Sequence, residues 1–157
     1  MRRKDKALPN DAVVRLLTAG EYGVLSTVDA KGQAYGVPLN YVFINDHLYF
    51  HCALEGHKIA NILANSKVSF CVVGRTRVLP AEFSTEFESV IVFGEASVVQ
   101  GDERYLALTS LVEKYSPAFV EQGQQYIKQF DSRTKVVKIK VDSMTGKAAP
   151  PAKISLA

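Results

Sequence analysis

Apolar side chains recur along this chain with two different periods, every second residue in some stretches and every third or fourth residue in others. The period of two predicts strands, and the longer period predicts helices. The first half of the chain therefore predicts a helix over 10–20, strands over 23–28, 35–44 and 47–52, and a helix over 56–65. The second half predicts strands over 67–73 and 86–99, helices over 102–115 and from 117 onward, and a strand over 137–141.

Strand 35–44 carries apolar residues on both of its faces. Tyr35 and Val37 point to one side, whereas Pro38 and Val42 point to the other. Two apolar faces are typical of a strand that is covered on both sides. We therefore expect this strand to be buried on both faces.

The order of the elements decides the fold class. The turn residues at 29–32 and 45–46 join neighbouring strands directly, which indicates an antiparallel meander rather than βαβ units. We expect a mainly β protein with flanking helices, built as a small closed or split antiparallel barrel. At 157 residues, a single domain is expected over 1–144, followed by a flexible C-terminal tail over 145–157.

Composition and charge exclude several classes of protein. The net charge of +3 lies partly in the two ends of the chain and forms no basic stripe, so nucleic acid is not an expected partner. No apolar run is long enough for a membrane span, and the polar run 9–11 interrupts any secretory signal, so we expect a cytoplasmic protein. The spacing of Cys52 and Cys71 fits no zinc pattern, and no glycine-rich phosphate loop follows a strand.

The stretch 49–61 combines a strand end, a short loop and the first turn of a helix. A helix start presents unpaired N–H groups and the positive end of the helix dipole, which favour an anion. Gly56 allows a ligand to approach the backbone, and His57 and Lys58 add donors. We therefore consider a phosphate site here. The plainer alternative is a solvated Lys58 beside a His57 that only caps the helix.

His51 is the candidate for chemistry on the strand that precedes this loop. If Leu48 and Phe50 face the core, His51 points outward, toward a cleft or a subunit boundary. The alternative is a polar residue with no catalytic part. Together with His47 and His57 it shows no ligand spacing on one element, so no metal site is expected.

Several segments resemble the Nim-type nitroimidazole-resistance proteins of the pyridoxamine 5′-phosphate oxidase-like family. These segments are MRRKD (1–5), EYGVLST (21–27), YGVPLNYV (35–42), YFHCALEGHK (49–58), VSFCVVG (68–74) and ESVIVFG (88–94). The resemblance covers about residues 1–141 in the order of that family. It implies an antiparallel FMN-binding split β-barrel that forms a homodimer, with two FMN sites at the subunit interface.

The resemblance also implies which residues contact FMN. His57 and Lys58 would hold the phosphate, assisted by the strand end Phe50, His51 and Cys52. The ring would lie along the backbone of Val37, Pro38, Leu39 and Asn40, where Pro38 fits because it donates no hydrogen bond to a ladder. Glu88 and Ser89 would lie near the ring, contributed either by the same chain or by the partner. His51 matches a histidine that the family associates with its active site.

The sequence departs from the oxidase branch of the family at two places. That branch holds the phosphate with an arginine and a lysine on the second strand, where this chain has Val37 and Val42. Its C-terminal substrate motif is also missing, since the corresponding segment here is 138–141. Pyridoxamine phosphate is therefore not an expected substrate.

The expected function is that of an FMN-dependent reductase for a small electron-poor compound, such as a nitroaromatic or a 5-nitroimidazole. Reduced nicotinamide would supply electrons, and His51, with an ordinary pKa, would donate a proton or anchor the substrate. The homodimer would use Phe87, Ile91 and Phe93 as its apolar surface. Two alternatives remain open: a non-catalytic flavin or haem binder with His51 or His57 as axial ligand, and a deazaflavin enzyme.

Overall fold

The structure is a computed structural model that describes residues 2–149. The first half of the chain contains η1 (Lys4–Lys6), α1 (Asn10–Ala19), β1 (Gly23–Val28), β2 (Ala34–Leu39), β3 (Val42–Ile44), β4 (His47–Cys52) and α2 (His57–Ala64). The second half contains β5 (Lys67–Leu79), η2 (Pro80–Glu82), β6 (Ser84–Val99), α3 (Gly101–Tyr115), η3 (Pro117–Phe119), α4 (Val120–Gln129), η4 (Asp131–Arg133) and β7 (Lys135–Ala149). None of the helices within 2–149 has the length and apolar character that a transmembrane span requires.

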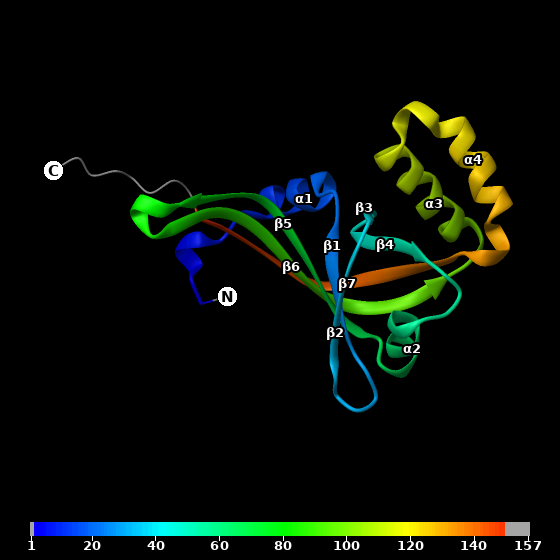
Figure 1. Cartoon of the computed structure of the whole chain (residues 1–157), viewed down its shortest axis with the longest axis horizontal. Helices are drawn as coiled ribbons and strands as arrows, with labels where there is room; N and C mark the ends of the chain where they lie inside the picture. The colour runs from blue at the N-terminus through cyan, green and yellow to red at the C-terminus, as the bar shows by residue number, and fades with distance from the viewer. Residues whose placement is uncertain (1, 150–157) are drawn as a thin grey trace.

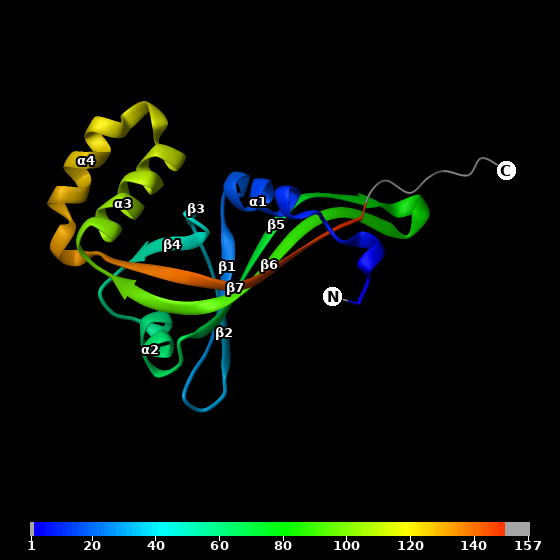
Figure 2. The same ribbon diagram turned by 180° about the vertical axis from the view of Figure 1, so that it is seen from behind.

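The strands form one antiparallel sheet in the order β2-β1-β5-β6-β7-β4-β3. Figures 1 and 2 show that this sheet curls into a barrel at one end, whereas β5, β6 and the last part of β7 continue as a long arm at the other end. The expectation of a mainly β split barrel with flanking helices is therefore confirmed. The pairing of β6 with β7 has a register shift after Phe93, where a Cβ on Gly94 would stand 2.2 Å from the Lys140 carbonyl oxygen.

The two turns expected from the sequence have the geometry that their residues favour. The Asp29 carboxylate accepts the N–H groups of Lys31 and Gln33, both at 2.8 Å, and closes the β1–β2 turn. Asn45 and Asp46 both have positive φ, which matches the right-handed twist of the strands β3 and β4. These local contacts fix the register of both hairpins.

Two apolar cores lie on opposite faces of the sheet. The larger core fills the barrel, with side chains such as Leu25, Phe50 and Phe70 fully buried. The smaller core lies between α3–α4 and the outer face of β4 and β7, and includes Tyr49 and Val136. Residues on β4 therefore alternate between the two cores, so this strand is covered on both faces.

The expectation that strand 35–44 is a single strand buried on both faces is wrong. The chain bends at Asn40 and Tyr41, so that β2 pairs with β1 at one edge of the sheet and β3 pairs with β4 at the other edge. β2 has only one neighbouring strand within 2–149, and Pro38 is exposed on its open face. Burial within residues 2–149 therefore does not account for the apolar residues on that face.

The expected C-terminal tail is also partly wrong. Residues 145–149 continue β7 along the arm, where Thr145 pairs with Ile91 and Ala149 pairs with Phe87. The residues of this segment are mostly small and show no apolar alternation, so the pattern did not indicate a strand, although the backbone pairs with β6. The expectation for residues 150–157 lies outside the described residues.

The bend between β2 and β3 closes the barrel, and α3 supplies hydrogen bonds for its backbone. The Tyr41 N–H donates to Tyr115 Oη at 3.0 Å, and Lys114 Nζ donates to the Tyr41 carbonyl at 3.0 Å. Tyr115 Oη donates in turn to the Glu21 carbonyl at 2.6 Å. The Tyr41 ring is fully buried in the barrel, and its hydroxyl donates to the Leu17 carbonyl of α1 at 2.6 Å. Tyr41 thus connects the strand bend, the barrel core, and the helices α1 and α3.

We expect Tyr115→Phe to lower the free energy of unfolding by about 1–3 kcal/mol, because the Tyr41 N–H loses its acceptor in a partly buried position. Urea denaturation followed by circular dichroism measures this. Tyr126→Phe is the matched control, since Tyr126 is 63% exposed and the same change there should cost less than about 0.5 kcal/mol. Equal stability of the two variants would show that the bend does not depend on Tyr115.

Candidate functional site

The start of α2 provides a backbone site for an anion. Its first helical hydrogen bond runs from the Ala60 N–H to the Gly56 carbonyl, so the N–H groups of His57, Lys58 and Ile59 have no helical acceptor. Gly56 has a φ of 133°, and nothing lies within 4 Å of the position that a Cβ would take. A ligand can therefore reach the backbone at the positive end of the helix dipole.

Positive side chains surround this helix start. The ammonium groups of Lys58 and Lys135 both act on the Cys52 thiol, partly offsetting the burial that raises its pKa. Lys135 also donates to the Leu54 carbonyl and so ties β7 to the loop before α2. Two cations and a helix N-terminus at one corner suit a phosphate group.

β2 connects this corner with a second part of the site. The Tyr35 and His57 rings contact each other with centroids 4.3 Å apart. Asn61 Nδ2 donates to Thr27 Oγ1 at 2.9 Å in the buried layer below, which fixes α2 on the β1–β2 hairpin. From Tyr35 to Asn40 the strand extends by about 17 Å. As an edge strand, β2 also presents unpaired backbone groups along this path.

A cavity of about 290 Å³ lies at the Asn40 end of β2. Its walls come mainly from the α3–α4 hairpin, which Figure 1 shows above β4. The apolar and aromatic lining residues are Leu108, Leu111, Val112, Tyr115, Tyr126, Ile127 and Phe130. The polar lining residues are Asn40, His51, Ser116 and Thr134. The two predicted site residues Asn40 and His51 therefore face one space.

His51 points away from the barrel core, as the strand alternation predicts. The Phe50 side chain is fully buried in that core, whereas the His51 ring lines the cavity. Desolvation by its surroundings lowers the pKa of His51 from the usual value of 6.5. The expectation of an ordinary pKa is therefore wrong, and His51 is mainly neutral at pH 7.

The other residues expected to hold the cofactor differ in how accessible they are to a ligand. Val37 and Leu39 pack against the barrel core, and Pro38 is exposed on the open face of β2. Phe50 could contact a ligand only through its backbone. Cys52 is half-buried beside the α2 corner.

Glu88 and Ser89 do not approach this site within one chain. His51 pairs with Val136 on β7, whereas Glu88 pairs with Ala148, twelve positions further along the same strand. That separation corresponds to about 40 Å of extended strand. Only a second copy of the chain could bring Glu88 or Ser89 to the site.

Sequence reasoning missed most of the cavity wall. The apolar stripe of the helix over 102–115 was visible, but a stripe does not tell which surface it covers. The roles of Tyr115 and Phe130 depend on contacts between segments more than 70 residues apart, such as the Tyr41–Tyr115 hydrogen bond. The stripe includes Tyr115 but does not indicate these contacts, and no local signal in the sequence marks Phe130.

The fold is an antiparallel split barrel whose edge strand β2 lies beside a helix start with free N–H groups. The family model described as pyridoxamine 5′-phosphate oxidase matches residues 9–148, and the chain belongs to this family. No curated protein matches the sequence.

Solved structures from several bacteria share this fold. A candidate 5-nitroimidazole antibiotic resistance protein from Bacteroides thetaiotaomicron is 24% identical with a TM-score of 0.72, covering 90% of this chain and 86% of its own. A conserved hypothetical protein from Mycobacterium tuberculosis is 16% identical with a TM-score of 0.82, covering 98% and 96%. A FAD-binding protein from Mesorhizobium loti is 23% identical with a TM-score of 0.68, covering 92% and 98%. At these identities the similarity shows the fold.

Lys114, next to the cavity residue Tyr115, yields a pH-dependent prediction. Burial lowers the pKa of Lys114 to about 8, with its Nζ 4.1 Å from the centre of the Tyr41 ring. The unfolded chain keeps a lysine pKa of about 10.4 and binds more protons between pH 8 and 10, so the free energy of unfolding should rise with pH in this window. Burial raises the pKa of Tyr41, so its hydroxyl stays protonated in this range.

Urea denaturation at pH 7.5, 8.5 and 9.5 measures the slope. Lys114→Gln keeps a donor for the Tyr41 carbonyl but removes the titration, so its free energy of unfolding should rise less over the same range. Parallel curves for the wild type and the variant would contradict the assignment to Lys114.

Proposed function

We propose that the protein is a flavin-dependent oxidoreductase that reduces a small electron-poor compound, with FMN as its cofactor. The observation that carries this proposal is that the edge strand β2 has the start of α2 at its Tyr35 end and the cavity that His51 lines at its Asn40 end. An elongated ligand with an anionic end and a flat ring fits such a path. The Mesorhizobium loti protein of the same fold is a FAD-binding protein, which supports a flavin as the ligand.

Each end of the path suits one part of FMN. The N–H groups of His57 and Lys58, with the Lys58 and Lys135 ammonium groups, would bind the phosphate. The edge of β2 would contact the ring through backbone groups. The exposed Pro38 fits this edge because it has no N–H that needs a partner strand. FMN carries one phosphate, whereas FAD carries two. The corner at the start of α2 is sufficient for one phosphate, and we therefore choose FMN over FAD.

A homodimer is part of this proposal. Val73 and Phe93 are 54% and 53% exposed on the outer face of the sheet, which they share with Ile91 and Ser89. Pairing two such faces would cover them and could bring Ser89 of one copy toward the ligand of the other. Glu88 points to the opposite face, beside α1. Sedimentation of a flavin-loaded monomer would contradict this part of the proposal.

His51 would position the substrate in this scheme. Bound flavin supplies the electron transfer itself. Because its pKa is lowered, His51 is neutral at pH 7 and offers one ring N–H as a donor. It would hold an electron-rich atom of the substrate, and the neighbouring apolar wall would exclude water. We therefore favour a hydrogen-bond anchor over a charged proton donor.

The first experiment is a visible spectrum of the purified protein, followed by chromatography of the acid-released ligand. FMN gives two flavin bands and one released species. FAD would overturn the choice of FMN, a Soret band would identify a haem protein, and a colourless protein that takes up no added FMN would overturn the proposal.

We expect Lys58→Glu to abolish FMN retention while the fold stays intact. The substitution removes a charge-assisted contact and adds repulsion at the phosphate, a combined effect on the order of several kcal/mol. Titration of added FMN by fluorescence quenching measures the affinity. Lys128→Glu, an identical charge change at an exposed position of α4, should bind FMN as the wild type does. Full flavin occupancy in Lys58→Glu would refute the phosphate assignment.

We expect His51→Ala to leave the flavin spectrum unchanged but to slow reoxidation by a nitroaromatic acceptor about tenfold, the value of one neutral hydrogen bond. His51→Gln retains a donor and should recover most of the rate. Stopped-flow kinetics separate flavin reduction from reoxidation, and only the second step should change.

His47→Ala is the control, because His47 lies on the same strand outside the cavity lining. In a Lys114→Gln background, where the lysine with a pKa of about 8 no longer titrates, the rate should also be flat between pH 7 and 9, since His51 is already neutral there. A rate that falls across this range, or an equal deficit in His47→Ala, would show that the anchoring role is wrong.

A further inference from the structure

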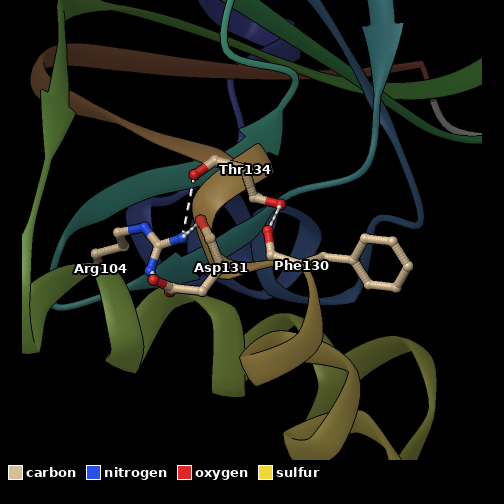
Figure 3. Close-up of polar contacts among 4 residues, drawn as sticks. All are labelled: Arg104, Phe130, Asp131 and Thr134. Atoms are coloured by element: carbon tan, nitrogen blue, oxygen red, sulfur yellow. Dashed lines mark hydrogen bonds and ion pairs between the residues drawn. The ribbon is translucent and has the colours of Figure 1, made fainter.

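The connection between α4 and β7 is held to α3 by one side chain. Arg104 of α3 donates through Nη2 to the backbone carbonyls of Asp131 and Thr134, at 2.9 and 3.1 Å, and its guanidinium also pairs with the Asp131 carboxylate. Figure 3 shows this guanidinium reaching both residues of the connection. The Thr134 hydroxyl donates to the Phe130 carbonyl at 2.9 Å and ties the connection to the end of α4. The connection therefore has a fixed position relative to α3.

Burial distinguishes Arg104 from its partner Asp131. The Arg104 side chain is 12% exposed, whereas the Asp131 side chain is 61% exposed. An exposed carboxylate contributes little through an ion pair, whereas hydrogen bonds from a charged and mostly buried donor are stronger. The guanidinium carries its donors on a rigid planar fork, so it can satisfy two carbonyls at once. The two carbonyl contacts are therefore the part of this cluster that holds the backbone.

The second of these carbonyls belongs to the peptide group that begins β7. This peptide joins Thr134 to Lys135, the first residue of the strand, which pairs with Cys52 at the end of β4. The Lys135 ammonium donates to the Leu54 carbonyl in the loop that leads to Gly56 and α2. One hydrogen bond from α3 thus fixes the peptide group next to the lysine that reaches the loop before α2.

Lys135 lies at a strand end, where few other contacts hold it. The pairing of β6 with β7 begins at Val136, so among residues 2–149 Lys135 has a strand partner only on β4. Strand ends with few backbone contacts open locally at low cost. A long lysine side chain also loses much rotamer freedom when it is held in one place. Without the Arg104 contact, we expect the ammonium to spend less time at the Leu54 carbonyl.

We propose that Arg104 is a positioning residue for the corner at the start of α2: by holding the peptide between Thr134 and Lys135, it keeps the Lys135 ammonium at this corner. The consequence for FMN affinity rests on the proposed function, whereas the placement of Lys135 does not. In this scheme Arg104 acts only through Lys135.

Cys52 reports on Lys135 without any flavin. Burial raises the pKa of the Cys52 thiol, and the ammonium groups of Lys58 and Lys135 oppose this effect. Arg104→Gln should let the Lys135 ammonium move away and raise the pKa of Cys52 further, so that its thiolate fraction at pH 8 falls at least about twofold. The pH dependence of alkylation by iodoacetamide, read by peptide mass spectrometry at matched flavin content, measures this pKa. Cys71 is the internal reference, because burial alone raises the pKa of its thiol.

The matched variants separate positioning from charge. Lys135→Gln should also raise the pKa of Cys52, and Arg104→Gln should add nothing further in that background. Arg133→Gln removes the same charge from an exposed residue of η4 and should leave Cys52 unchanged. An unchanged pKa of Cys52 in Arg104→Gln, a further rise in the double variant, or an equal rise in Arg133→Gln would overturn the proposal.

The affinities for FMN and riboflavin provide the second measurement. Riboflavin lacks the phosphate, so a loss confined to FMN separates an effect at the corner from a general loosening of the fold. Arg104→Gln should weaken FMN binding at least about threefold, but less than about 1.5-fold in a Lys135→Gln background. Riboflavin affinity should stay within about 1.5-fold in every variant. Equal weakening for both flavins would show a purely structural role and overturn the proposal.

Arg104→Lys decides the question if Arg104→Gln does not fold. Its ammonium can donate to one of the two carbonyls, so this variant should raise the pKa of Cys52 and weaken FMN binding in the same direction, by a smaller factor. No change in either measurement would again overturn the proposal.

The two proposals fail in different ways. If the wild-type protein binds no FMN, the oxidoreductase is wrong, and the Cys52 measurement alone decides the role of Arg104. If FMN binds equally well with and without Arg104→Gln, the oxidoreductase stands and the positioning role is wrong.

Discussion

The backbone of Tyr41 is the point on which the rest of the structure depends. A strand that changes its pairing partner leaves peptide groups without a ladder, and such groups are costly to bury. Here Tyr115 and Lys114 provide the missing hydrogen bonds from α3, while the Tyr41 ring fills the barrel. The barrel can close because a helix from a distant part of the chain completes the hydrogen bonding of its bend.

Because of these contacts, α3 has two structural roles. Its C-terminal end stabilises the bend, and its apolar face forms the wall of the cavity that Asn40 and His51 meet. The geometry of the candidate site is therefore set by barrel closure, since Asn40 belongs to the bend itself. Any shift of α3 would change both the closure of the sheet and the width of the cavity.

The parts that the sequence could predict are those that local patterns determine. Alternating apolar residues predicted the strands, and the run from Gly56 to Lys58 predicted the start of a helix, because this signal lies in neighbouring residues. The prediction for strand 35–44 was wrong because apolar residues alone do not tell whether the same chain covers them. The stretch from Thr145 to Ala149 misled because its mostly small residues show no apolar alternation, although its backbone pairs with β6. The cavity was unpredictable because Asn40, His51 and the two helices meet only in the folded chain.

The pairing of β4 with β7 has a consequence for how the protein is made. His47 pairs with Lys140, and Cys52 pairs with Lys135, so the barrel needs residues that are synthesised more than 80 positions later. Until β7 leaves the ribosome, the β3–β4 hairpin has one edge without a partner strand. Such non-local pairing slows folding and prolongs the exposure of unpaired edges. The nascent chain is therefore most vulnerable to aggregation during the synthesis of α3 and α4, before the last strand arrives.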